Sequence, residues 1–490
     1  MAADGVQSLA RKQAVLTEQA LETARFGLSR AWPMRSAHQR LTGAQAMILV
    51  FLGLLIAAAW IWRPAWLAIS LHGALFVIFA ACAALRLASS LMLIMPPKQA
   101  KQKWRGPLPV YTLLCPMYRE AEQVPRLLGV LGRLDYPRDL LDVKLLIEAD
   151  DRETLEALQA IALPPWAECL VLENCAPRTK PKALNAGLGL ARGRFLTVYD
   201  AEDHPHPGQL REALDAFASG GADLACVQAP LLIDNAGNSW VSQQFALEYA
   251  VQFLGQGALL ARLHLPFPLG GSSNHFRTEA LRASGGWDAF NVTEDADVGF
   301  RLARDGWRFG TLQAPTYEEA PEKLGAWLRQ RSRWIKGHMQ TWLVLMRDPL
   351  GALRELGLWG FASMQIAMGG AVLSAFCGAP TMIALLVGGL LFPQALGVMD
   401  IGLALFALIS AACVGVLASA RLRQARLAYA LFSQPLYWCL AFPAACLALY
   451  ELVLRPFYWA KTSHGQARRE NGFALDVASP EPLEHADHAN

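Results

Sequence analysis

The sequence has few charged residues, and this scarcity indicates its class. Asp, Glu, Lys and Arg make up only 17% of the 490 residues, against about 25% in typical soluble domains. Hydrophobic residues make up 54%, and the mean hydropathy is +0.25. An ordinary soluble protein is therefore disfavoured. The composition predicts an integral membrane protein that carries a soluble part.

Other absences narrow the function. The net charge is only +3 and no basic stripe is interleaved with aromatics, so we expect no nucleic-acid partner. The nine cysteines form no C-x-x-C pair and no Cys/His cluster at zinc spacing. This indicates that they serve as small apolar side chains in a reducing compartment. Residues 1–45 contain no apolar core of the signal-peptide type, so we expect a cytoplasmic N-terminal segment without a cleaved leader.

The first apolar region is residues 46–95, interrupted at Arg63-Pro64. It is long enough for two transmembrane helices joined by a short hairpin. Basic residues lie on both flanks, from Arg11 to Arg40 and from Lys98 to Arg105. Because basic flanks favour the cytoplasm, both ends of this hairpin are expected there.

The second apolar region is residues 356–454, where we expect about four transmembrane or interfacial helices. The candidate segments are 356–376, 380–396, 399–419 and 428–453. Four crossings would return the tail to the cytoplasm but would leave Arg421, Arg423 and Arg426 outside, against the charge rule. One segment lying in the interface is the alternative. We expect six crossings in total and a polar, disordered tail at 465–490.

Between these regions, segments with strand and helix character alternate. Apolar strand-like segments at 110–116 and 143–151 are separated by amphipathic helical patterns. This alternation predicts a parallel sheet with helices on both faces over residues 106–323. In such sheets ligands bind where the strands end. Residues 324–350 then predict an amphipathic helix at the membrane interface.

Three carboxylates follow one predicted strand within four residues: Asp200, Glu202 and Asp203. Such close carboxylates repel one another beside a buried strand. A helix N-cap would explain only one of them, whereas a divalent cation such as Mg²⁺ or Mn²⁺ accepts carboxylates together with substrate phosphates. Asp150 and Asp151 end another strand at the same edge, and for them capping remains an equal alternative.

Several stretches, in this order, are similar to motifs of one enzyme family. The domain resembles a family 2 glycosyltransferase of the α/β GT-A fold, inserted between transmembrane helices. More narrowly, it resembles membrane-embedded β-glycan synthases such as cellulose and hyaluronan synthases. Arg119 and Glu202 depart from the usual motif residues. The stretches are "CPMYRE" (115–120), "EADD" (148–151), "TKPKALN" (179–185), "DAED" (200–203), "VTEDADVGFRL" (292–302) and "RQRSRWIKG" (329–337).

The resemblance implies a catalytic base at Asp295, next to Glu294, although Thr293 or Asp295 could also cap the following helix. It implies a set of residues that bind the nucleotide-sugar donor: Tyr118, Glu120, Asp150, Asp151, Lys180, Asp200 and Arg333. Lys180 could instead be a solvated residue at a helix start. The implied metal ligands are Asp200 with Glu202 or Asp203.

The resemblance places the acceptor sugar on a second set of residues: Gln330, Trp334, Gly271 and Ser272. Gln330 and Trp334 are four residues apart and so share one helix face with Arg333. Arg333 can pair with a diphosphate, and Trp334 offers a flat face to a sugar ring.

We therefore expect a multi-pass bacterial inner-membrane enzyme with its catalytic domain in the cytoplasm. It would transfer glucose from UDP-glucose, with inversion, to a growing β-linked exopolysaccharide and conduct the product through the lipid bilayer, with periplasmic or outer-membrane export partners. One alternative is a single-addition transferase acting on a lipid acceptor. Another is a transferase-like component of an export or adsorption system, in which catalysis is secondary.

Overall fold

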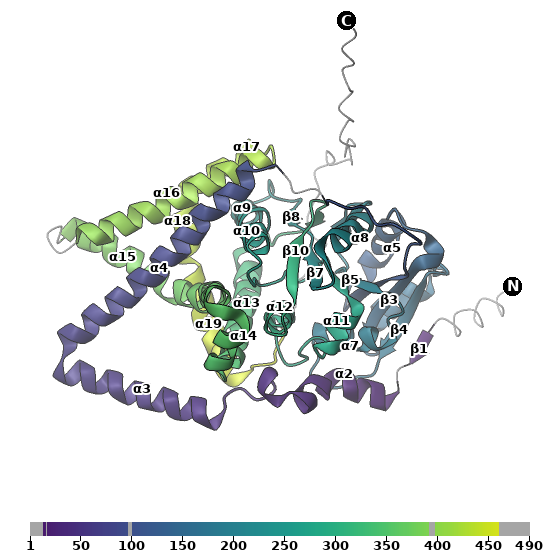
Figure 1. Ribbon diagram of the computed structural model, residues 1–490, viewed down its shortest axis with the longest axis horizontal. Coiled ribbons are helices and arrows are strands. Elements are labelled where there is room, and N and C mark those ends of the chain that lie inside the picture. Colours follow the sequence, from purple (N-terminus) through teal and green to yellow (C-terminus); the bar gives the residue numbers. More distant parts are fainter. Residues whose placement is uncertain (1–12, 16, 97–99, 392–396, 460–490) are drawn as a thin grey trace, which may run out of the picture.

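The structure is a computed structural model that describes residues 13–15, 17–96, 100–391 and 397–459. An α/β domain forms one end of the molecule, and long apolar helices project from its other side (Figure 1). The predicted tail at 465–490 lies outside the described residues.

The α/β domain is built on an eight-stranded sheet with the order β1-β4-β3-β2-β5-β9-β7-β10. The first five strands in this order are parallel, and β9 runs antiparallel between β5 and β7. The expected α/β class is confirmed, but the sheet is mixed because β9 returns between two parallel neighbours. The strands are β1 (Gln13–Val15), β2 (Tyr111–Met117), β3 (Leu141–Glu148), β4 (Ala167–Leu172), β5 (Phe195–Val198), β7 (Leu224–Gln228), β9 (Asn274–Arg277) and β10 (Arg308–Thr311).

Helices cover both faces of this sheet, as alternation of the two patterns predicts. Every residue of β3 is buried, which is typical of a strand covered on both faces. The covering helices are α2 (Glu18–Ala31), α5 (Val124–Leu131), α6 (Arg152–Gln159), α7 (Lys180–Leu190), α8 (Gln209–Gly220), α10 (Ala258–Arg262), α11 (Thr278–Ala283) and α12 (Glu294–Arg304).

A small three-stranded sheet stands beside the carboxyl ends of the parallel strands. It consists of β6 (His204–Pro205), β11 (Thr316–Glu318) and β8 (Leu231–Ile233). Two helices connect the α/β domain to the apolar helices: α9 (Trp240–Tyr249), which continues as the π-helix η4 (Ala250–Gly257), and α13 (Leu324–Leu345).

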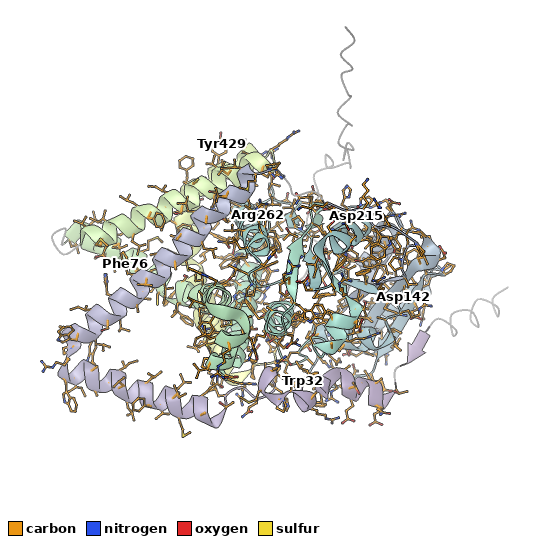
Figure 2. The ribbon with its side chains drawn as sticks, viewed as in Figure 1. Trp32, Phe76, Asp142, Asp215, Arg262 and Tyr429 are labelled. Atoms are coloured by element: carbon orange, nitrogen blue, oxygen red, sulfur yellow. The ribbon has the colours of Figure 1, made fainter. Side chains whose placement is uncertain are left out.

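Five helical runs in the described part of the chain are long and apolar enough to cross a membrane. The side chains of the first run stand apart from the rest of the protein (Figure 2), and Val50 and Ile61 are 63% and 72% exposed, as lipid contact requires. The runs are α3 (Gly43–Trp62), α4 (Pro64–Ile94), Pro349–Leu391 (α14, η5 and α15), α16 (Val398–Arg421) and Ala425–Leu454 (α17 to α19).

The count of five differs from the six crossings expected. The segment expected at 356–376 and the described part of the one expected at 380–396 belong to one run, Pro349–Leu391, because Pro380 lies inside α15 (Ala371–Leu391) without ending it. The run is kinked at Gly357, and residues 392–396 lie outside the described residues. Proline is tolerated in this way inside membrane helices.

The last apolar run differs from a simple span, because both of its ends bind the α/β part. Near its start, the Gln243 amide of α9 donates to the Arg426 carbonyl at 2.7 Å. Near its end, the Lys336 ammonium of α13 lies 2.7 Å from the Glu451 carboxylate. This run therefore begins and ends on the same side of the molecule.

Candidate active site

A large cavity begins at the carboxyl ends of the parallel strands. It has a volume of about 1370 Å³ and extends from Asp200 and Asp295 past Trp334 to side chains of α4, α15 and α16. Since pockets for small ligands usually have volumes of about 300–1,000 Å³, this one can hold more than a single small molecule.

Asp200 follows β5 and lies against Lys180, the first residue of α7. Their side chains form an ion pair, and the Lys180 ammonium also donates to the Gly271 carbonyl at 2.8 Å. Burial alone would lower the pKa of Lys180, but the charges of Asp200 and Glu294 outweigh it and raise that pKa. Lys180 is therefore a fixed cation in the cavity, close to two carboxylates.

The other two acids of the cluster have different surroundings. Asp203 is 1% exposed and accepts hydrogen bonds from the Ser272 hydroxyl and the Asp200 backbone N–H. It does not line the cavity, whereas Glu202 does. Asp203 thus holds the turn in place, and Glu202 is the acid that lines the cavity together with Asp200.

These carboxylates fit a hard divalent cation. Asp200 and Glu202 both face the cavity, and one buried oxygen of Asp203 lacks a hydrogen-bonding partner in the described chain. No group of three His, Cys, Asp or Glu residues among those described could hold an ion alone. This is consistent with Mg²⁺ or Mn²⁺, which use one or two carboxylates and complete their coordination with phosphates and water.

A second pair of acids enters the cavity from the first turn of α12. Glu294 and Asp295 both line it. Burial, with the charge of Asp295, raises the pKa of Glu294 to about 8, so this acid is largely protonated at neutral pH. Burial also raises the pKa of Asp295, while the Ala296 N–H and Lys180 oppose this shift. The two acids of this pair therefore differ, since Glu294 is held largely neutral beside Asp295.

The helix-cap alternative for this motif describes the geometry only in part. Thr293 occupies the N-cap position of α12 but makes no side-chain capping hydrogen bond. One oxygen of Asp295 accepts the Ala296 N–H at 2.8 Å. The other faces Gly271, where a β-carbon would lie 3.3 Å from it. Gly271 thus leaves one carboxylate oxygen accessible.

Arg333 of α13 brings a second cation to the same carboxylates. Its guanidinium carbon lies 4.5 Å from the ring centre of Trp459, and its buried Nε atom has no hydrogen-bonding partner in the described chain. Burial lowers the pKa of Arg333, while Glu294 and Asp295 oppose that shift. An incompletely paired, buried guanidinium suits an anionic ligand.

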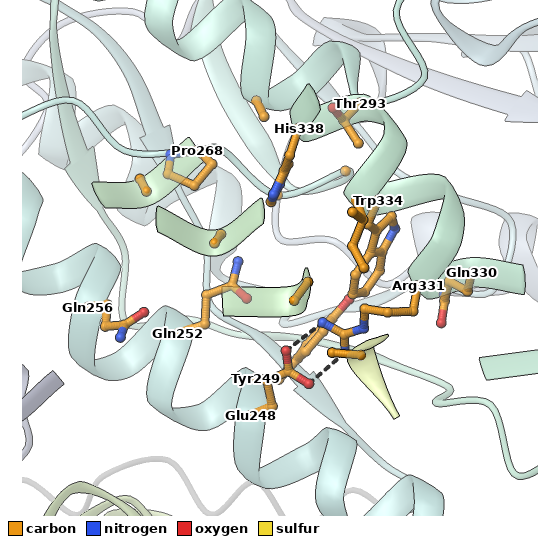
Figure 3. A pocket seen from close by; sticks show the side chains of 18 of the residues that line it. Glu248, Tyr249, Gln252, Gln256, Pro268, Thr293, Gln330, Arg331, Trp334 and His338 are labelled. Carbon is orange, nitrogen blue, oxygen red and sulfur yellow. Dashed lines mark hydrogen bonds and ion pairs between the residues drawn. The ribbon is translucent and has the colours of Figure 1, made fainter. Parts of the chain in front are cut away.

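Several side chains pack around Trp334, the predicted platform for a sugar ring. Its ring is stacked on Tyr249, with centroids 6.2 Å apart and planes at 28°. The guanidinium of Arg331 lies 4.9 Å from the Trp334 ring centre, and Arg331 is itself held by both oxygens of Glu248 at 2.6 Å (Figure 3). Gln330 and Ser272 line the same cavity.

The predicted nucleotide contacts divide into two groups. Tyr118 and Glu120, which follow β2, line the cavity. Asp150 and Asp151 do not: Asp150 pairs with Arg178 at 2.7 Å, and Asp151 accepts the Thr154 N–H as the N-cap of α6. For Asp151 the capping alternative describes its contact with α6, and donor binding by Asp150 and Asp151 stays a prediction.

The sequence analysis did not predict several residues that line the cavity, among them three charged ones. Glu148 and Arg178 line the cavity beside Lys180, and Glu318 enters from β11. Burial raises the pKa of Glu318 to about 8, and its side chain is hydrogen-bonded to Tyr249. Glu148 stands in the "EADD" stretch, so the motif itself could have indicated it, whereas no local signal marks Glu318.

The arrangement joins three chemical features at one sheet edge. Two carboxylates fit a divalent ion, two cations fit a diphosphate, and a buried carboxylate lies near an aromatic platform. These features are chemically suited to the transfer of a group from an anionic donor to an acceptor.

Comparison with known proteins gives the family. The model described as "Glycosyl transferase family group 2" matches residues 195–454. That match covers more than half of the chain, and the protein belongs to this family. The predicted family is thereby confirmed.

Curated relatives are similar over about half of their own length. A probable glucomannan 4-beta-mannosyltransferase 7 of Oryza sativa subsp. japonica is 26% identical over 264 residues, which cover 51% of this chain and 44% of the relative. A beta-monoglucosyldiacylglycerol synthase of Trichormus variabilis is 26% identical over 282 residues, 56% of this chain and 58% of the relative. A solved mannosyltransferase from Pyrobaculum calidifontis, in complex with GDP-Man and Mn²⁺, is 20% identical with a TM-score of 0.47, over 77% of this chain and 99% of that one.

Proposed function

We propose that this protein is a membrane glycosyltransferase that moves a hexose from a nucleotide sugar to an acceptor held in the cavity. Its main product would be a β-linked polysaccharide, with UDP-glucose as the favoured donor. The observation that carries the proposal is the continuous cavity from Asp200 and Asp295, past Trp334, to the apolar helices.

The chain's own residues account for the transfer. Lys180 and Arg333 would hold the diphosphate, since they are the cations beside the carboxylate cluster. Asp295 would accept the proton of the attacking acceptor hydroxyl, and Trp334 would hold the acceptor ring by stacking. Attack from the face opposite the diphosphate inverts the sugar carbon.

Asp200 and Glu202 would hold Mg²⁺ or Mn²⁺. A bound divalent ion neutralises the charge that develops on a leaving diphosphate. The names of the relatives are consistent with a hexose donor of either the glucosyl or the mannosyl type.

The experiment is to incubate purified protein in lipid nanodiscs with labelled UDP-glucose, GDP-mannose and UDP-N-acetylglucosamine and to size the products. We expect one donor to be preferred and long chains to form early, while most acceptor remains unextended. A wild type that stops after one sugar would contradict polymer synthesis.

A second candidate is single addition to a lipid, as the name of the diacylglycerol-glucosylating relative suggests. The observation in its favour is the apolar character of the membrane-side wall, to which Phe76, Phe79 and Ala375 contribute. The same assay separates the two candidates, because a lipid acceptor would yield a single glycolipid that is extracted into organic solvent.

The contacts of the last apolar run support an orientation. Because Ala425–Leu454 begins and ends on the α/β part, we infer four crossings, α3, α4, α15 and α16, with that run lying against the catalytic domain. Arg421, Arg423 and Arg426 then share the side of the catalytic domain, which removes the charge conflict found in the sequence.

This orientation is tested with peptide epitopes in intact cells. An epitope inserted after Arg63 should bind antibody without permeabilisation, and one inserted after Arg423 should require it. Antibody access to Arg423 from outside would contradict the four-crossing arrangement.

A further inference from the structure

Two helices line the cavity beyond Trp334, each with residues spaced by four. On α9 and η4 these are Glu248, Gln252 and Gln256; on α13 they are Gln330, Trp334 and His338. All six line the cavity. Residues four apart lie on one face of an α-helix, and the π-helical winding of η4 extends the α9 stripe. π-Helical turns are frequent at functional sites.

The two stripes face each other. Tyr249 is stacked on Trp334, and about one turn further along each helix Gln252 and His338 line the same cavity. Figure 3 shows these two side chains directed toward one another across the space. One turn corresponds to about 5.4 Å along a helix axis, so this level of the cavity lies directly next to the sugar platform.

The hydrogen-bonding groups at this level are available to a ligand. Glu248 is already engaged, since Arg331 and the Tyr437 hydroxyl occupy its carboxylate. In contrast, the side chains of Gln252, Gln256 and His338 form no hydrogen bond with any part of the chain that the structure describes. Polar groups in a mainly apolar cavity are costly unless a ligand or water pairs with them.

The chemistry of these groups favours a neutral, hydroxylated ligand. A glutamine amide both donates and accepts hydrogen bonds, and so does a neutral imidazole. Burial, with the nearby Arg331 charge, lowers the pKa of His338 to about 4, so this ring is neutral at physiological pH. Neutral donors and acceptors beside an aromatic platform match sugar hydroxyl groups.

We propose that Gln252, Gln256 and His338 form a second acceptor subsite that binds the sugar residue behind the one stacked on Trp334. The proposal depends on the proposed transferase function and extends it by one sugar unit. The ligand is a saccharide of at least two residues, which is either a growing glycan or the headgroup of a glycolipid.

The test compares one-sugar and two-sugar acceptors in protein reconstituted in nanodiscs. Two series are used: soluble β-linked mono- and disaccharide glycosides, and mono- and diglycosyl diacylglycerols. With Gln252→Leu or His338→Leu we expect the acceptor KM for two-sugar acceptors to rise about 2- to 10-fold, as for one lost hydrogen bond. The KM of one-sugar acceptors and of the donor should not change.

Two variants serve as controls. His338→Gln keeps neutral groups that donate and accept hydrogen bonds. Its affinity for two-sugar acceptors should therefore be close to that of the wild type. Gln243→Leu removes an amide from the same helix, α9, which bonds to the Arg426 carbonyl and does not line the cavity. This variant should leave every KM unchanged.

A donor-free arm measures disaccharide binding to wild type and variants by saturation-transfer NMR. An effect confined to the lipid series identifies a glycolipid headgroup, and one confined to the soluble series identifies a growing glycan. Equal losses for one- and two-sugar acceptors would overturn the subsite, as would unchanged disaccharide binding in Gln252→Leu and His338→Leu. If wild type transfers no sugar from any donor, the proposed function fails, while the binding arm still decides the subsite.

Discussion

The Asp295→Asn variant tests the proposed base at a single atom. Asparagine keeps the size of the side chain and can keep the hydrogen bond from the Ala296 N–H to Oδ1, which is 2.8 Å long. It loses the proton-accepting oxygen that faces Gly271. Because a positioned base contributes about 10²- to 10⁴-fold, we expect kcat to fall by that factor, about 3–5 kcal/mol in activation free energy.

The assay is nucleotide release at saturating donor and acceptor, together with calorimetric measurement of donor affinity. Donor affinity should be unchanged, because the donor contacts are Lys180 and Arg333. Burial raises the pKa of Asp295 above its usual value, and the base must be deprotonated to act. In wild type, therefore, kcat should begin to fall on acidification at a higher pH than an ordinary aspartate would give.

A matched control lies at the other end of the same helix. Asp305→Asn alters a partly exposed acid that pairs with Arg35 at 2.6 Å, and kcat should stay near that of wild type. If Asp295→Asn also keeps near-normal kcat, Asp295 is only a helix-terminal residue. The search for the base would then move to Glu294.

Further predictions concern the metal, the glycine and the platform. Asp200→Ala should abolish turnover without lowering the unfolding temperature. EDTA should stop turnover by the wild-type enzyme until Mg²⁺ or Mn²⁺ is added, and full activity in excess EDTA would count against a metal. Gly271→Ala places a β-carbon 3.3 Å from the Asp295 carboxylate and should lower kcat. In the control Gly189→Ala the added β-carbon has no atom within 4 Å and kcat should not change. Equal kcat in both variants would refute the steric argument. Trp334→Ala should raise the acceptor KM about 2- to 10-fold through lost stacking and leave the donor KM unchanged, so a change confined to the donor would reassign this residue.

The sequence predicted those features that depend on local pattern. Asp200 and Glu202 could be placed because they follow an apolar strand, and parallel strands end at one edge of a sheet. Trp334 could be placed because its spacing from Gln330 fixes a helix face. Asp151 was ambiguous, since an N-cap and a ligand use the same residue type at the same point.

Other features depend on tertiary packing that no local pattern carries. Glu318 reaches the cavity because β11 pairs with β6 and β8, which are distant in sequence. The hydropathy of Ala425–Leu454 suggests a span, and only contacts such as that of Lys336 with Glu451 place its end on the α/β part. Pro380 suggests a helix end, but neighbouring helices allow the chain to continue.

The charge balance of the cavity gives the strongest physical reason for a divalent ion. Ten acidic residues line the cavity, against five Lys or Arg, and Arg331 is already paired with Glu248. A nucleotide diphosphate is an anion, and in a partly desolvated site it would be repelled by this surplus. Raised pKa values neutralise some of the acids, such as Glu294 and Glu318, but Lys180 is already engaged by Asp200. A hard cation on Asp200 and Glu202 would bind the donor phosphates directly and convert these acids from repulsive neighbours into the anchor of the donor.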